Sequence, residues 1–125
     1  MASSVIQKTE AGVLGLSRSS DVNELRSLLK LTRNTFARLV GRTERTVTDW
    51  ETGKKVPQNI SLQKITELKR LTCELQKLMP KDSVGTWLSA PNTAFGDLKP
   101  LEVIERGETD RLWRMIYELE SGVPG

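Results

Sequence analysis

The sequence predicts an all-α protein, and three features of the 125-residue chain support this fold class. Apolar residues recur mostly three and four positions apart, which is the spacing of one face of an α-helix. Aromatic residues make up only 5% of the chain, and no two segments form a convincing strand pair. Glycine and proline gather at a few places, where they mark the ends of helices.

The length suits one domain or two small modules that share a core, and a chain of this size folds without disulfide bonds. Cys73 has no partner cysteine and lies in a helical pattern, so we interpret it as a core or flanking residue of a protein in a reducing cytoplasm. The chain contains no apolar run that spans a bilayer and no export signal, so we expect a cytoplasmic protein without a membrane partner.

The residue inventory narrows the possible chemistry. The chain has no histidine and one cysteine, which excludes histidine metal sites, Cys-His clusters and histidine general bases. Catalysis by a carboxylate or a lysine remains possible, but the sequence contains no motif that indicates it. We therefore expect a protein that is not an enzyme and has no catalytic residue, no metal and no cofactor.

Residues 1–19 are rich in serine, threonine and glycine and show no sustained period, so we expect a flexible N-terminal arm. With only Lys8 and Arg18 as basic residues, a solvated tail is favoured over a DNA-binding arm. The first helix is expected from about Asp21 to Lys30. Asp21 is its predicted cap, and its buried stripe is formed by Leu25, Leu28 and Leu29.

Residues 31–57 predict two short helices joined by a tight turn at Gly41. Thr32 and Thr43 are the expected N-caps, and Gly53 closes the second helix in the left-handed conformation. Val47 and Trp50 are predicted to point inward. The second helix would then point four hydrogen-bonding side chains outward: Glu44, Arg45, Thr48 and Asp49.

An ordinary helical hairpin with solvated basic residues is the alternative for this segment, and the local charge argues against it. Residues 26–57 carry eight basic side chains against three acidic ones, an excess that suits phosphate. The segment resembles the Xre-type, lambda-repressor-like helix-turn-helix family without a gap. The matching residues are Leu31, Thr32, Phe36, Ala37, Leu39, Gly41, Thr43, Arg45, Thr46, Val47, Trp50, Glu51, Gly53, Lys54 and Pro57.

This resemblance implies how double-stranded DNA would be bound. In such a fold the second helix of the pair faces base edges, and Arg45 is the best candidate because its guanidinium can donate twice to guanine. The candidate base contacts are Glu44, Arg45, Thr48 and Asp49, and the candidate phosphate contacts are Arg33, Arg42, Thr46, Lys54 and Lys55. Glu44 and Asp49 could instead orient Arg45 and Arg42. Alternatively, Glu44 could only stabilise the helix start and Asp49 could be a solvated carboxylate. A homodimer on an inverted-repeat operator is the expected working form.

A longer helix is predicted from about Leu62 to Met79, capped by Asn59 or Ser61 and ended by Pro80. Its apolar stripe consists of Ile65, Leu68, Leu71 or Thr72, Leu75, and Leu78 or Met79. This helix would connect two modules of opposite charge. Residues 81–125 carry five basic and eight acidic side chains, a balance that DNA would repel and that suits a protein partner.

The acidic segment predicts a short helix, a turn and a second short helix over residues 86–107, followed by a final helix from about Thr109 to Glu120. Pro91-Asn92 opens the turn, Gly96 supplies a bend, and Pro100 suits the first turn of a helix. That helix would bury Leu101, Val103 and Ile104 and stop at Gly107, and the final helix would be lined by Leu112, Met115, Ile116 and Leu119.

This arrangement is similar to the toxin-binding domain of the Xre/MbcA/ParS antitoxins. The matching residues are Trp87, Leu88, Pro91, Asn92, Ala94, Gly96, Pro100, Leu101, Ile104, Gly107, Leu112 and Gly122. The resemblance implies a dimeric DNA-binding antitoxin and autorepressor whose C-terminal end blocks a RES-domain toxin that degrades NAD. The residues implied in toxin binding are Leu119, Gly122, Val123, Pro124 and Gly125.

The chain departs from the family pattern at two places. Residues 94–97 read Ala-Phe-Gly-Asp where the family often has Leu-Gly-Gly, and the last helix carries the bulky Trp113 and Tyr117. Trp113 and Tyr117 could form an exposed strip that a dimer interface would explain, and Trp87 with the Pro91-Asn92 turn could simply seal the core.

Together these features divide the chain into an arm (1–19), a helix-turn-helix module (20–60), a connecting helix (61–80) and a toxin-binding or dimerisation domain (81–125). The leading hypothesis is an antitoxin and autorepressor. The alternative is a stand-alone Xre-type transcriptional regulator whose C-terminal domain only dimerises.

Overall fold

The computed structural model of the protein describes residues 19–122. Seven α-helices and two 3-10 helices occur in this range, and the described residues form no strand beyond one isolated bridge between Asn92 and Leu98. The all-α prediction is confirmed. Apart from Ser19, the arm predicted over residues 1–19 lies outside the described residues. None of the described helices is both long enough and apolar enough to cross a membrane.

Helix α2 (Ser19–Leu28) starts and ends two residues earlier than predicted. Asp21 lies buried inside its first turn, so the expected N-cap at this residue is wrong. The helix ends where Lys30 takes up a left-handed conformation (φ 58°), which lets the Leu31 N–H donate to the carbonyl of Arg26 at 3.1 Å. This reversal directs the chain into the next helix.

Helices α3 (Arg33–Val40) and α4 (Glu44–Glu51) form the predicted pair. The hydroxyls of Thr32 and Thr43 each accept the backbone N–H three residues on, at 3.1 Å and 3.2 Å, so both predicted N-caps are confirmed. Gly41 ends α3 with φ 70°, a conformation that glycine adopts without steric cost. The tight turn between the two helices therefore follows from three local residues.

Helix α5 (Asn59–Leu78) begins three residues earlier than predicted and ends before Pro80 as expected. Its N-cap is Gln58, in an extended conformation and without a side-chain capping bond, so the expected caps at Asn59 and Ser61 are wrong. Asn59 is already part of the helix, with φ 54°. Where the chain turns into a helix depends on the backbone leaving the preceding loop, which the sequence pattern does not reveal.

The segment after Pro80 folds in the predicted order of short helix, turn, short helix and final helix. Its elements are η1 (Lys81–Ser83), α6 (Val84–Leu88), η2 (Thr93–Phe95), α7 (Pro100–Glu105) and α8 (Thr109–Ser121). The side chain of Asn92 caps η2 by accepting the Ala94 N–H at 2.9 Å, and Pro100 occupies the first position of α7. Both turn signals therefore act as expected.

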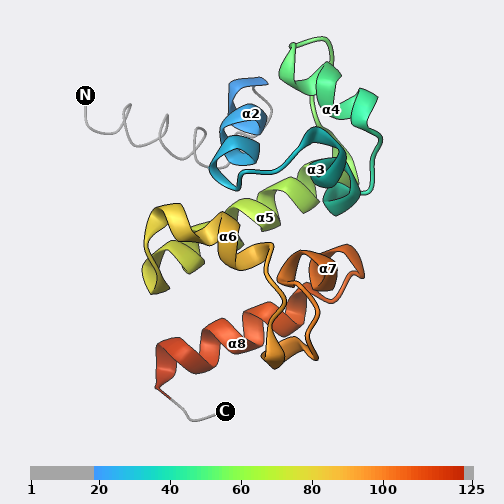
Figure 1. Cartoon of the computed structure of the whole chain (residues 1–125). Helices are drawn as coiled ribbons and strands as arrows, with labels where there is room; N and C mark the ends of the chain where they lie inside the picture. Colours follow the sequence, from blue (N-terminus) through green and yellow to red (C-terminus); the bar gives the residue numbers. More distant parts are fainter. Residues whose placement is uncertain (1–18, 123–125) are drawn as a thin grey trace, which may run out of the picture.

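Helix α5 runs through the middle of the molecule, with α2, α3 and α4 toward one end and α7 and α8 toward the other (Figure 1). One continuous apolar core extends from α2 to α8. The predicted stripes are largely confirmed, but four of the residues named for them are only half-buried and two are exposed. The half-buried ones are Leu28, Met79, Ile104 and Met115, and the exposed ones are Leu78 and Leu119, so Met79 rather than Leu78 packs against the core.

The two ends of the molecule meet directly as well as through α5. A Cβ atom on Gly85 of α6 would lie 2.6 Å from the carbonyl oxygen of Leu29, so α6 approaches the end of α2 at a distance that only glycine permits. On α3, Arg38 Nε donates to a carboxylate oxygen of Glu105 on α7 at 3.0 Å. A single core crosses residues 60 and 80, and the division into modules at these residues stays a prediction.

Candidate nucleic-acid interface

Helix α4 is anchored by two side chains that point inward as predicted. Val47 is fully buried and Trp50 nearly so, and both belong to the core that α2 and α3 share with α4. The opposite side of the helix carries Arg45, whose side chain is 79% exposed. The inward orientation of Val47 and Trp50 and the outward orientation of Arg45 are confirmed.

The four candidate base contacts do not share one environment. Glu44 and Arg45 are exposed, and Thr48 is half-buried with its hydroxyl donating to the Glu44 carbonyl at 3.1 Å. Asp49 is buried, so the prediction that it points outward is wrong. The loop after α4 folds back on this residue, because the N–H groups of Lys54 and Lys55 both donate to the Asp49 carbonyl.

The candidate phosphate contacts also differ in availability. Arg42, Lys54 and Lys55 are exposed, and their exposure agrees with contact to a polyanion. Thr46 is half-buried, and its hydroxyl lies 3.0 Å from the capping hydroxyl of Thr43. Contact of these residues with DNA stays a prediction.

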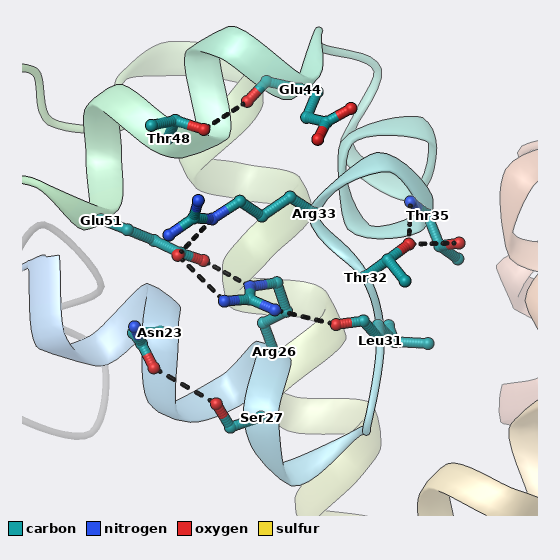
Figure 2. A network of polar contacts seen from close by, with 10 residues as sticks. All are labelled: Asn23, Arg26, Ser27, Leu31, Thr32, Arg33, Thr35, Glu44, Thr48 and Glu51. Atoms are coloured by element: carbon teal, nitrogen blue, oxygen red, sulfur yellow. Dashed lines mark hydrogen bonds and ion pairs between the residues drawn. The ribbon is translucent and has the colours of Figure 1, made fainter.

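Arg33 is held by Glu51, a residue to which the sequence pattern assigned no role (Figure 2). The Glu51 carboxylate accepts the Arg33 Nε at 2.9 Å and the Arg26 Nη2 at 3.0 Å, while Arg26 also donates to the Leu31 carbonyl at 3.0 Å. The Glu51 side chain is only 1% exposed. Residues from α2, α3 and α4 therefore converge on one buried carboxylate.

One feature of the sequence could have drawn attention to Glu51. An acidic residue in the last turn of a helix lies at the negative end of the helix dipole, which is unfavourable unless cations compensate. Arg26 and Arg33 supply that compensation. Burial tends to raise the pKa of Glu51, but the hydrogen bonds from Arg26 and Arg33 outweigh it and hold the pKa below its ordinary value.

The C-terminal candidate residues fall at the end of α8. Leu119 is 59% exposed rather than buried in the core. Ile116, one turn earlier, is the last buried residue of α8. Gly122 ends the helix. Val123, Pro124 and Gly125 lie outside the described residues, so the structure places only two of the five.

The aromatic side chains near this end divide into packing and exposed groups. Trp87 lies edge-on to Phe95, with ring centroids 6.5 Å apart, and packs against the core. Trp113 is half-buried against the core, whereas Tyr117, one turn later, is 70% exposed. The surface at the end of α8 therefore presents Tyr117 and Leu119 as apolar groups.

Comparison with known proteins gives one consistent group of relatives. No protein-family model matches the chain. The antitoxins called mycobacterial cidal antitoxin MbcA from Mycobacterium bovis and Mycobacterium tuberculosis are 30% identical over 95 residues, which cover 76% of this chain and 84% of theirs. Among solved structures, a chain of the M. tuberculosis MbcT–MbcA toxin–antitoxin complex matches with a TM-score of 0.66 and 28% identity, covering 86% of this chain and 96% of that one.

Proposed function

This chain belongs to the family of the mycobacterial cidal antitoxin MbcA, and from that membership we propose that it is the antitoxin of a toxin–antitoxin pair that also represses its own transcription. The toxin proposed for it is a RES-domain protein that degrades NAD. Its working form is a homodimer on an inverted-repeat operator. The likeness to a chain from a toxin–antitoxin complex, over 96% of that chain, is the observation that carries the antitoxin function.

The DNA-binding part of the proposal is supported by the surface of α4. A helix held from behind by Val47 and Trp50 presents an Arg45 side chain that is 79% exposed. Exposed cations lie on the flanking turns at Arg42, Lys54 and Lys55. A planar donor flanked by cations is the arrangement that direct base contacts and phosphate contacts require.

The toxin-binding part is supported by the end of α8. Leu119 and Tyr117 are exposed apolar side chains on an acidic half of the molecule, a composition suited to a protein partner. The alternative, a stand-alone regulator, uses the same surface for dimerisation only. Exposure of Tyr117 favours neither, so the two functions must be separated by experiment.

The toxin assignment is tested by examining the reading frames beside that of this chain for a RES-domain protein and by co-expressing any such neighbour with this chain. We expect the two proteins to co-purify and NAD degradation by the toxin to cease in the complex. Leu119→Asp should release the activity, because it places a charge in an apolar contact. Val56→Asp is the matched control, since Val56 is an exposed apolar residue in the loop between α4 and α5. A RES-domain neighbour that neither binds nor is silenced would leave only the regulator.

DNA binding is tested by titrating a duplex from upstream of the chain's own reading frame at several salt concentrations. Arg45→Ala should cost about 1 to 3 kcal/mol and relax the preference at one base pair. Lys54→Ala should instead weaken binding to all sequences alike and lower the salt slope by about one. Lys54 is a cleaner comparison than Arg33, because Arg33 also pairs with Glu51. Equal loss on every sequence for Arg45→Ala would contradict base contact by this residue.

A further inference from the structure

Asp49 occupies an unusual position for an acidic residue beside a proposed DNA surface. Its side chain is only 10% exposed and lies between two cations, with Arg45 Nε at 3.7 Å from one carboxylate oxygen and Lys55 Nζ at 3.9 Å from the other. Arg45 comes from the exposed side of α4, and Lys55 comes from the loop that follows the helix. One buried carboxylate thus joins a candidate base contact to a candidate phosphate contact.

The backbone of the same residue organises that loop. The Asp49 carbonyl accepts the N–H of Lys54 at 2.9 Å and of Lys55 at 3.1 Å, and the hydroxyl of Thr52 donates to it at 3.4 Å. The loop is therefore folded over Asp49 by main-chain bonds, which bring Lys55 to the carboxylate. The proximity of Lys55 to Asp49 is built into the end of α4.

Burial and pairing together determine what this carboxylate can do. A carboxylate removed from water is costly unless cations or hydrogen bonds compensate it, and Arg45 and Lys55 are the cations that meet it. The contact with Arg45 is made through Nε, which leaves the terminal NH2 groups of the guanidinium for a base edge. A base contact by Asp49 itself would require the carboxylate to leave this covered position.

We propose that Asp49 is a positioning residue that orients Arg45 toward the DNA groove, with Lys55 as the second cation on its carboxylate, and that it makes no base contact. The inference rests on the proposed DNA binding and deepens it. The preference of the protein for a particular DNA sequence then comes from contacts made by Arg45 and its exposed neighbours. Asp49 affects this preference only by holding Arg45 in place. An uncharged side chain of the same shape at this position would leave Arg45 mobile.

The experiment measures the full-length protein on a library of random-sequence DNA duplexes, by sequencing the bound fraction, and titrates the average affinity. Asp49→Asn should lower the preference at the base pair contacted by Arg45 by about tenfold. The average affinity should not fall, because the variant removes a negative charge beside the phosphates. A residue that only stabilised the fold would lower preference and affinity together.

The chain offers a matched control in α8. Asp110 pairs with Arg114 one turn later at 3.7 Å, the same spacing and distance as Asp49 and Arg45, but this pair lies on α8 and is 73% and 70% exposed. Asp110→Asn should leave both readouts unchanged. The double variant Asp49→Asn with Arg45→Ala should lose no more preference than Arg45→Ala alone, because Asp49 acts through Arg45.

The outcomes separate this inference from the proposed function. If the unsubstituted protein selects no sequence and shows no salt-dependent binding, the proposed DNA binding is wrong. If it selects a sequence and Asp49→Asn retains that preference, DNA binding stands and the positioning role is wrong. Loss of preference at a base pair that Arg45→Ala does not affect would mean that Asp49 contacts a base itself, which also overturns the inference.

A second measurement covers the case in which Asp49→Asn does not fold. In the unsubstituted protein, NMR relaxation of the Arg45 Nε–H should show a more rigid side chain than that of Arg114, although both arginines are highly exposed. Equal mobility of the two Nε–H groups would overturn the positioning role.

Discussion

At the scale of single residues, the structure depends most on Glu51. Its buried carboxylate receives Arg26 from α2 and Arg33 from the start of α3, and it belongs to the last turn of α4. Figure 2 shows these three side chains meeting between the helices. Because the partners are 25 and 18 positions away in sequence, this contact ties together three elements that local pattern alone would leave independent.

We expect Glu51→Gln to lower the free energy of unfolding by about 3 kcal/mol, because it leaves two cations beside an uncharged buried group. The measurement is urea denaturation followed by circular dichroism. Glu74→Gln is the control, because Glu74 pairs with Lys77 on the surface of α5, where water screens the charges, and this substitution should leave the unfolding midpoint nearly unchanged. Equal effects of the two substitutions would contradict the central role of Glu51.

The lowered pKa of Glu51 also predicts how stability depends on pH. In the unfolded chain this carboxyl titrates near its ordinary value of 4.5, and in the folded protein it titrates below that value. The folded state therefore gains its full benefit above pH 4.5 and loses it as the pH falls from 4.5 through the lower folded pKa. Unfolding midpoints measured across this range should fall more steeply for the unsubstituted protein than for Glu51→Gln. Parallel pH profiles would refute the assignment.

At the scale of elements, the sequence predicts some helix starts correctly and others not, and the difference depends on whether a side chain caps the helix. The caps at Thr32 and Thr43 were predicted because their hydroxyls bond to groups three residues away. The starts of α2 and α5 were missed, since α2 begins before Asp21 and α5 begins after Gln58 without a side-chain cap. Where a side chain caps the helix, the sequence identifies the boundary.

The cap of α4 can be tested directly. Thr43→Ala should destabilise the protein by about 1 kcal/mol, because it removes the acceptor for an N–H in the first turn of α4. The same variant should weaken binding to the upstream duplex, since the proposed base contacts lie in that turn and the next. Thr93→Ala changes an exposed threonine at the start of η2 and should affect neither property. Unchanged thermal unfolding of Thr43→Ala would show that the cap contributes nothing.

At the scale of the whole molecule, the proposed DNA-binding and toxin-binding surfaces belong to one packed body. The core continues from α2 to α8, Arg38 on α3 pairs with Glu105 on α7, and Gly85 on α6 meets the backbone at Leu29. The Lys30 ammonium also donates to the Asp82 carbonyl at 3.4 Å. Cations from the N-terminal half thus meet acceptors from the C-terminal half.

Gly85→Ala tests this close approach. The added methyl group would meet backbone atoms of Leu29 at 2.6 Å and 2.9 Å, so helices must shift, and we expect a loss of about 1 to 3 kcal/mol in unfolding free energy. Thr86→Ala, on an exposed position of the same helix, should be neutral within about 0.5 kcal/mol. Full stability of Gly85→Ala in urea denaturation would mean that the two halves separate at little cost.

The sequence by itself determined the all-α class, the order of the helices, the turn at Gly41, the inward Val47 and Trp50 and the outward Arg45. These features depend on helical periodicity and on capping and turn residues within a few positions of one another. Only the tertiary structure decided that Asp49 is covered, that Glu51 joins three helices and that Gly85 must be glycine. Each of these depends on a loop folding back or on partners from another element. The free energy of such contacts depends on how deeply the groups are buried and on how close the folded chain brings them. A local pattern of residues contains neither quantity.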